Sequence, residues 1–300
     1  MTNFVPEAQS LTNRDFSRIG RVVVIGKNGF VGNSVIEVLH QNKVSVIGLG
    51  RSDIDLTSSA AQARLSKVIK PHDIVIFAAG EVPVKTVEQF NSNLVALENC
   101  IKGLNGIDLT QFIYVSSDAV YEDSSTPLSE SSPRAPESLH GLMHLTREIM
   151  LETSHLNNVL CLVRPTLIYG AKDPHNGYGP CLFMRLANKL QPISLFGGGE
   201  ERRDFVHISD VSEVIFELVR SKYTGSLNIA TGKLNSFYEI ATLVSKVVGA
   251  DIEIKKIPRN GPMPHNGYRA FSTDLLKLRF PNVHMKSIEI GLRTMVGGNQ

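Results

Sequence analysis

The sequence lacks several features that would place it in other classes of protein. It has only three cysteines in 300 residues, Cys100, Cys161 and Cys181, and their spacing matches neither a C-x-x-C pair nor a metal site. Its 31 Lys and Arg nearly balance 29 Asp and Glu, and no apolar run is long enough to span a bilayer. We therefore expect buried, reduced thiols in a cytoplasmic protein, with neither nucleic acid nor a membrane as a partner.

The beginning of the chain also lacks the apolar segment of a secretory signal, so residues 1–20 are expected to form a polar arm. The remaining residues are sufficient for a sizeable core, because 42% of the chain is hydrophobic. Length alone allows one large domain or two smaller ones.

The stretch VVVIGKNGFVG, residues 22–32, carries the strongest local signal. Four β-branched residues predict a strand buried on both faces, as in a parallel sheet. The glycines that follow let the chain turn, approach a pyrophosphate and begin a helix whose N–H groups face the anion. The expected cofactor contacts are Gly26, Lys27, Gly29, Phe30, Val31 and Gly32. The alternative is an ordinary strand-turn-helix with incidental glycines.

The second apolar run, VSVIGLG, ends at Arg51 without an acidic residue at its tip. In a dinucleotide fold an acid at this point accepts from the ribose 2′-OH, whereas an arginine suits a 2′-phosphate. The sequence therefore favours NADP, with NAD as the alternative and Lys27 as a second cation. Arg51 is otherwise solvated or stacked on adenine.

Strand-like and helical segments then alternate, which predicts an α/β fold with a Rossmann-type doubly wound parallel sheet. Ligands bind such sheets at the carboxyl ends of the strands. The expected cofactor contacts also include Asp55 and Leu56 beside the adenine, the small residues Ala78, Ala79 and Gly80 at the end of the third apolar run, and Asn93 in the next helix.

From Arg21 onward the chain resembles the extended short-chain dehydrogenases/reductases, the NAD-dependent epimerase/dehydratase group that modifies nucleotide sugars. The resemblance rests on seven segments in order: GKNGFVG, DIDLT, IFAAG, VSSDAVYE, LVRPTLIYG, GGGEERRDFVHISDV and STDLLKLRFP. It implies that Ser117, four residues before Tyr121, is the catalytic hydroxyl that hydrogen-bonds the reacting sugar oxygen.

The family's Tyr-x-x-x-Lys pair is replaced here. In the matching segment, SLHGLMHLTREIM, His140 stands at the tyrosine position and His144 at the lysine position. The spacing of four keeps both side chains on one helix face. An imidazole titrates near neutral pH, so His140 is the expected acid/base, with His144 bonded to the ribose.

Two other interpretations of this replacement remain open. The protein is then either a pseudoenzyme that binds dinucleotide or nucleotide sugar, or a redox-neutral isomerase or lyase that uses His140 as its base. The histidine pair also resembles half of a metal site, but no third ligand is evident, so no metal is expected.

By resemblance, Pro165 and Leu167 lie beside the nicotinamide, although many relatives have asparagine at the Leu167 position. Arg203 and Arg259 correspond to arginines that hold the diphosphate of a nucleotide sugar, as planar bidentate donors do. The expected sugar-nucleotide contacts are Ser117, Asn176, Arg203, Arg259 and Arg269.

The domain boundary is expected to be discontinuous. Residues 21–166 and the returning segment 204–232 form the dinucleotide-binding domain. Residues 167–203 and 233–300 form a smaller C-terminal substrate-binding lobe. The resemblance also implies a homodimer through the helices that carry residues 90–104 and 139–153.

Overall fold

The structure is a computed structural model, and it describes residues 19–296. The polar arm expected over residues 1–20 therefore lies almost wholly outside the described residues.

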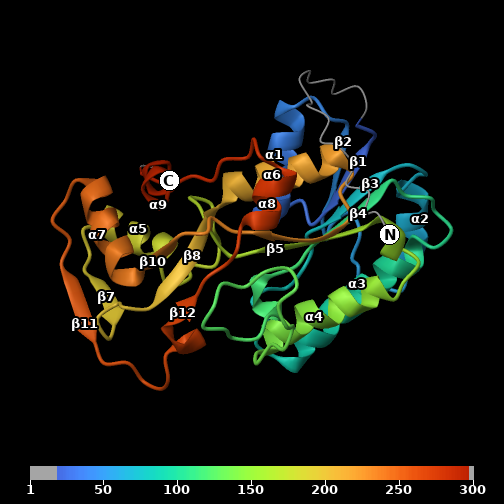
Figure 1. Ribbon diagram of the computed structural model, residues 1–300. Helices are drawn as coiled ribbons and strands as arrows, with labels where there is room; N and C mark the ends of the chain where they lie inside the picture. Colours follow the sequence, from blue (N-terminus) through green and yellow to red (C-terminus); the bar gives the residue numbers. More distant parts are fainter. Residues whose placement is uncertain (1–18, 297–300) are drawn as a thin grey trace, which may run out of the picture.

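A six-stranded parallel sheet forms the centre of the larger lobe (Figure 1). Every strand is short and most are completely buried, which is why runs of β-branched and aromatic residues form them. The order across the sheet is β2 (Val46–Leu49), β1 (Val22–Ile25), β3 (Ile74–Phe77), β4 (Gln111–Val115), β5 (Leu160–Pro165) and β9 (Gly225–Ile229). This order confirms the Rossmann-type doubly wound sheet predicted from the sequence.

Helices cover both faces of this sheet (Figure 1). One face packs on α1 (Phe30–Gln41), α6 (Ile208–Ser221) and α8 (Asp274–Arg279), and the other on α2 (Ala61–Val68), α3 (Val87–Gly103) and α4 (Leu139–Glu152). Alternate residues of one strand enter the two cores: Val22 and Val24 pack toward α1 and α6, whereas Val23 and Ile25 pack toward α2 and α3. The two-sided burial stabilises the strand ends where ligands bind.

The smaller lobe contains a four-stranded sheet, a two-stranded sheet and three helices. The four-stranded sheet contains β6 (Leu167–Tyr169), β8 (Arg202–His207), β10 (Leu234–Ser236) and β12 (Tyr268–Arg269). The two-stranded sheet pairs β7 (Ile193–Phe196) with β11 (Ile254–Ile257). The three helices are α5 (Pro180–Asn188), α7 (Phe237–Val248) and α9 (Ile288–Arg293). After β8 the chain re-enters the larger lobe through α6 and β9 (Figure 1).

Two glycines of the first turn are required by close backbone approach. Gly26 has φ +106°, and a Cβ there would come within 2.8 Å of the Ala78 carbonyl carbon. A Cβ on Gly32 would overlap the Gly26 carbonyl oxygen. The turn between β1 and α1 is therefore tight on both sides.

The three cysteines are buried, as the sequence predicts. All three thiols are buried and free, and burial raises the pKa of Cys100 and of Cys181 to about 12. Within residues 19–296 no helix combines the length and apolarity that crossing a membrane requires.

Candidate functional site

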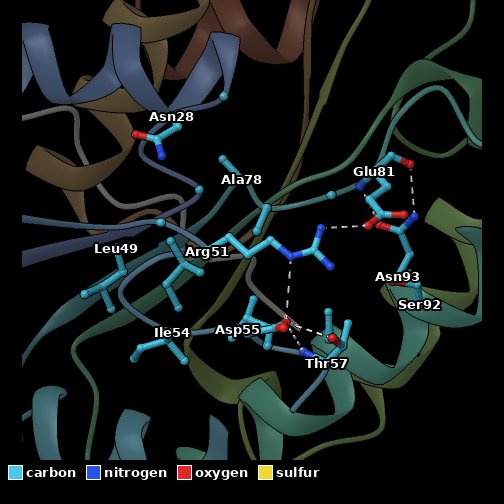
Figure 2. A pocket seen from close by; sticks show the side chains of 18 of the residues that line it. Asn28, Leu49, Arg51, Ile54, Asp55, Thr57, Ala78, Glu81, Ser92 and Asn93 are labelled. Carbon is cyan, nitrogen blue, oxygen red and sulfur yellow. Dashed lines mark hydrogen bonds and ion pairs between the residues drawn. The ribbon is translucent and has the colours of Figure 1, made fainter.

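A pocket of about 250 Å³, called here the first pocket, lies at the carboxyl ends of β1, β2 and β3 (Figure 2). Parallel strands bring their carboxyl ends to the same edge of the sheet, which explains why separate segments meet there. Nine of the expected cofactor residues line it: Gly26, Gly29, Arg51, Asp55, Leu56, Ala78, Ala79, Gly80 and Asn93.

The first turn of α1 offers backbone donors beside this pocket. Its N-cap is Gly29, and no side chain caps the helix, so the N–H groups of Phe30, Val31 and Gly32 stay available to a ligand. With the glycine turn described above, this arrangement fits the pyrophosphate of a dinucleotide. Phe30 itself lines a neighbouring cavity of about 390 Å³.

Arg51 follows β2 and extends across the first pocket (Figure 2). Its guanidinium lies 3.3 Å from Glu81 Oε1 and 4.0 Å from Asp55 Oδ1, and 69% of the side chain is exposed. Exposed ion pairs of this kind contribute little, so the guanidinium can turn to an anionic ligand. Glu81 has no local sequence signal, because 30 residues separate it from Arg51.

Lys27 has a partner of its own. Its Nζ lies 2.6 Å from Asp53 Oδ2, and this carboxylate also accepts from the Gly50 N–H. The hydrogen bond from Lys27 lowers the pKa of Asp53. Neither residue lines the first pocket, so Arg51 is the cation that β2 presents there.

Arg147 is a residue of the first pocket that the sequence reasoning missed. Its side chain is 1% exposed and lies over the Phe77 ring. It donates to Ala79 O and Asn93 O at 3.0 Å each, and to Asn93 Oδ1. Because Arg147 belongs to α4, it joins that helix to the walls of the pocket.

A second pocket of about 170 Å³ lies at the carboxyl end of β4, between the two lobes. It brings together the two residues expected to act on the sugar, Ser117 and His140. Its full lining is Ser117, Asp118, Ala119, His140, Leu167, Arg203, Asp204, His265, Arg269 and Phe271. Leu167, expected beside the cofactor, lies in this pocket instead.

His140 stands near the N-terminus of α4, which packs closely on the loop that follows β4. A Cβ on Gly141 would overlap the Ala119 carbonyl oxygen, so only glycine permits this approach. Burial lowers the pKa of His140, and the imidazole is therefore neutral near pH 7. Its Nδ1 accepts a long hydrogen bond of 3.5 Å from the Val84 N–H.

His144 is buried and lines neither pocket. Its Nδ1 lies 2.8 Å from the Tyr114 hydroxyl, and its ring meets His140 edge-on with centroids 4.8 Å apart. Burial, with His140 and Arg147 nearby, holds its pKa well below the usual value. His144 is thus neutral, and it brings no positive charge to this part of α4.

A buried ion network supports the loop that carries Ser117. Glu148 accepts from Arg164 Nε and Nη2 at 2.8 Å each, from Ser116 Oγ at 2.6 Å and from Arg134 at 2.9 Å. Ser117 then caps the short 3₁₀ helix η2 (Asp118–Val120) by accepting from the Ala119 N–H. The network holds the residue before Ser117, and the cap holds the turn after it.

The expected sugar-nucleotide contacts other than Ser117 divide into two groups. Arg203 and Arg269 line the second pocket; Arg203 also contacts Glu201 and Pro264 O, and Arg269 contacts the carboxylate of Asp118 at 3.0 Å. The structure does not bring Arg259 or Asn176 into either pocket.

Arg259 and Asn176 are held by other partners. Arg259 lies 3.0 Å from Glu201 Oε2 and over the Phe196 ring, and Asn176 accepts from Arg185. Pro165 is buried in β5.

His265 and Asp123 are further residues that the sequence reasoning missed. His265 lines the second pocket, and its Nδ1 lies 2.5 Å from Asp123 Oδ1. No local pattern connects residues 142 positions apart, so only the fold could reveal the pair. Residues 19–296 contain no group of three His, Cys, Asp or Glu placed to hold a metal ion.

Known proteins resemble this chain over most of its length. Residues 22–230 match the family described as NAD dependent epimerase/dehydratase. The GDP-L-fucose synthase of Sinorhizobium fredii is 26% identical over 259 residues, which are 76% of this chain and 80% of that protein.

Solved structures share the fold. The UDP-glucose 4-epimerase of Thermus thermophilus, in complex with NAD, has a TM-score of 0.79 at 22% identity and covers 93% of this chain and 98% of its own. The Thermotoga maritima UDP-glucose 4-epimerase with UDP-glucose has a TM-score of 0.78 at 23% identity, covering 92% and 97%. The glycine turn, the doubly wound sheet and the family match lead to one conclusion: this chain belongs to the NAD dependent epimerase/dehydratase family, within the extended short-chain dehydrogenases/reductases.

Proposed function

We propose that the protein binds a nicotinamide dinucleotide in the first pocket and acts on a nucleotide sugar in the second. The observation that carries this proposal is the meeting of Ser117, His140 and two arginines in one small cavity beside the strand ends. Ser117 and His140 contact the reacting oxygen of the sugar. Arg203 and Arg269 line the same cavity; Asp118 and Asp123 hold the Arg269 guanidinium, so Arg203 is the arginine that we assign to a diphosphate.

The preferred cofactor is NADP. Arg51 lines the first pocket, and its present partners are two exposed carboxylates at 3.3 Å and 4.0 Å. A 2′-phosphate carries more charge than either carboxylate and matches the guanidinium geometry. The cofactor, when bound, supplies or accepts hydride, while the chain's residues hold it and orient the sugar.

Titrating the protein with NADPH and NADH tests the cofactor assignment. We expect Arg51→Ala to weaken NADPH binding about tenfold or more, the loss typical of one charge-assisted hydrogen bond, and to leave NADH binding nearly unchanged. Lys67→Ala is the matched control, because this substitution also removes one positive charge, at an exposed position outside the first pocket. Equal losses for NADPH and NADH would contradict the assignment.

Proton NMR with a panel of nucleotide sugars, with and without NADP(H), tests the reaction. New sugar signals that disappear in His140→Phe, while saturation transfer to the bound sugar persists, would support His140 as an acid/base or donor at the reacting oxygen. His155→Phe, at an exposed position, is the control.

The second candidate function is binding without hydride chemistry. It is favoured by the position of His144, which is buried against Tyr114 and neutral, and so provides neither the charge nor the ribose contact of the family lysine. Cofactor and sugar binding with no conversion across the panel would favour this pseudoenzyme.

We further propose a cytoplasmic homodimer that pairs through α3 and α4. These helices expose Val95, Leu142 and Ile149, three apolar side chains that a second copy would cover. Sedimentation analysis of the protein and of Leu142→Asp tests the pairing, and a monomeric wild-type protein would contradict it.

A further inference from the structure

The second pocket holds a histidine that belongs to neither replaced position of the family motif. His265 lies in η4 (Pro264–Gly267), within the segment between β11 and β12. His265 and Asn266 have φ of +53° and +50°, a conformation uncommon for residues other than glycine. Such residues concentrate at functional sites, where the surrounding structure holds them.

The shorter contact of His265 Nδ1 assigns its tautomer. Nδ1 lies 2.5 Å from Asp123 Oδ1 and 3.1 Å from Arg269 Nη1, and the nearer group, an ionised carboxylate, only accepts hydrogen bonds. Nδ1 therefore carries the proton of the neutral ring, and Nε2 carries the lone pair. Among the described residues Nε2 has no hydrogen-bond partner, and 37% of the side chain is exposed.

Asp123 is itself held in place. Its Oδ1 accepts from Arg269 Nη1 at 2.8 Å, and Arg269 also donates to the carboxylate of Asp118 at 3.0 Å. Arg269 is 3% exposed, so this anchor is rigid. A base oriented by a carboxylate, which is in turn oriented by a buried cation, is a recurring catalytic arrangement.

His140 has the complementary tautomer. Its Nδ1 accepts from the Val84 N–H, so in the neutral ring the proton lies on Nε2. The pocket is thus lined by one imidazole that accepts and one that donates. Ser117 adds a hydroxyl donor on the same side as His140, because α4 packs on the Ser117 loop.

We propose, in an inference that rests on the proposed function, that the Asp123–His265 pair is a general base. It removes a proton from the carbon next to the carbonyl of a keto nucleotide sugar. His140 and Ser117 donate hydrogen bonds to the carbonyl oxygen. His265 contacts the substrate, and Asp123 is a positioning residue.

The step is balanced without any co-reactant. The C–H bond breaks and its proton forms a bond to His265 Nε2. The freed electron pair becomes the carbon–carbon double bond, and the carbonyl pair moves to oxygen as an enolate that His140 and Ser117 stabilise. After the proton on His265 Nε2 exchanges with solvent, return of a solvent hydrogen to the same face of the carbon restores the ketone with its hydrogen exchanged and its configuration kept, and no group is oxidised or reduced.

Hydrogen exchange in D₂O tests this assignment, with UDP- and dTDP-4-keto-6-deoxyglucose as the probes. Proton NMR follows loss of the signals on the carbons that flank the ketone, relative to a sample without protein. We expect exchange with the wild-type protein and a loss of about 100-fold or more in His265→Gln, the usual contribution of a positioned base. The matched control, His155→Gln at an exposed position, should exchange as the wild type does.

Asp123→Asn distinguishes a role of Asp123 in orienting His265 from a role in stabilising the fold. The amide still accepts from Arg269, but it no longer favours the proton on His265 Nδ1, so the pH profile of exchange should shift and the thermal midpoint should change little. Wild-type exchange no faster than the sample without protein would overturn the inference. Undiminished exchange in His265→Gln would also overturn it.

The same samples distinguish this inference from the proposed function. Cofactor binding and sugar oxidation or reduction without exchange at the flanking carbons would leave the proposed function standing and refute the inference. Exchange that needs His265 and consumes no NADP(H) would support the inference and show that the hydride part of the proposed function is wrong.

Discussion

His144 should make the protein sensitive to acid. Its folded pKa is held well below the usual value by burial, His140 and Arg147, whereas in the unfolded chain it titrates at about 6.5. The unfolded state therefore binds an extra proton as the pH falls. The free energy contributed by the neutral imidazole is fully present above the unfolded pKa and is lost below it.

The magnitude follows from one proton. Below the unfolded pKa the free energy of unfolding falls by about 1.4 kcal/mol per pH unit for this residue. Between about pH 7.5 and about pH 5.5, His144→Gln should therefore lose about 1.4 kcal/mol less than the wild type. Glutamine keeps a polar partner for the Tyr114 hydroxyl, so the site stays hydrogen-bonded.

Urea unfolding followed by circular dichroism at several pH values measures this difference. His207, whose pKa is also lowered by burial and which does not contact His144, contributes equally to both proteins and cancels. His155→Gln is the control, since His155 is exposed. Parallel curves for His144→Gln and the wild type would refute the claim that His144 is buried in its neutral form.

The stability of α4 should depend on its buried ion pairs and on its close packing against the Ser117 loop. Glu148→Gln should lower the free energy of unfolding by about 3–5 kcal/mol, because it leaves the buried Arg164 without its carboxylate, and urea unfolding measures this. The control Glu152→Gln, at a partly exposed ion pair with Arg134, should cost about 1 kcal/mol or less; equal losses would show that burial is not the cause. Gly141→Ala should cost about 1–3 kcal/mol in the same assay and reduce conversion of any sugar, since a Cβ would push α4 away from the Ser117 loop. Unchanged stability and activity would contradict that packing.

The sequence predicted the elements that depend on local pattern. The four β-branched residues of β1 and the glycines after them led to the correct strand, turn and helix, because burial on both faces and tight turns leave local signatures. The histidines at positions 140 and 144 were placed on one helix for the same reason. The sequence could not predict that the two rings have different surroundings, because His144 is buried against Tyr114 of β4, a separate strand.

Contacts between distant segments account for what the sequence could not predict. The sequence predicts Arg259 as a diphosphate contact, and the structure places its side chain against Glu201 and Phe196, outside both pockets. Arg147 and the Asp123–His265 pair went unnoticed because their partners lie 54 to 142 residues away. The positions of such side chains depend on how the loops and the two lobes pack together. The spacing of residues along the chain does not predict that packing.

Helix α4 contributes to both pockets, with His140 in the second and Arg147 in the first. The two residues are seven positions apart on one rigid helix, or about 10 Å along its axis. A ligand that shifts or turns α4 in one pocket must therefore move the lining of the other. Thermodynamic reciprocity then requires that dinucleotide and sugar change each other's affinity by the same factor, so the order in which they bind leaves the total binding free energy unchanged.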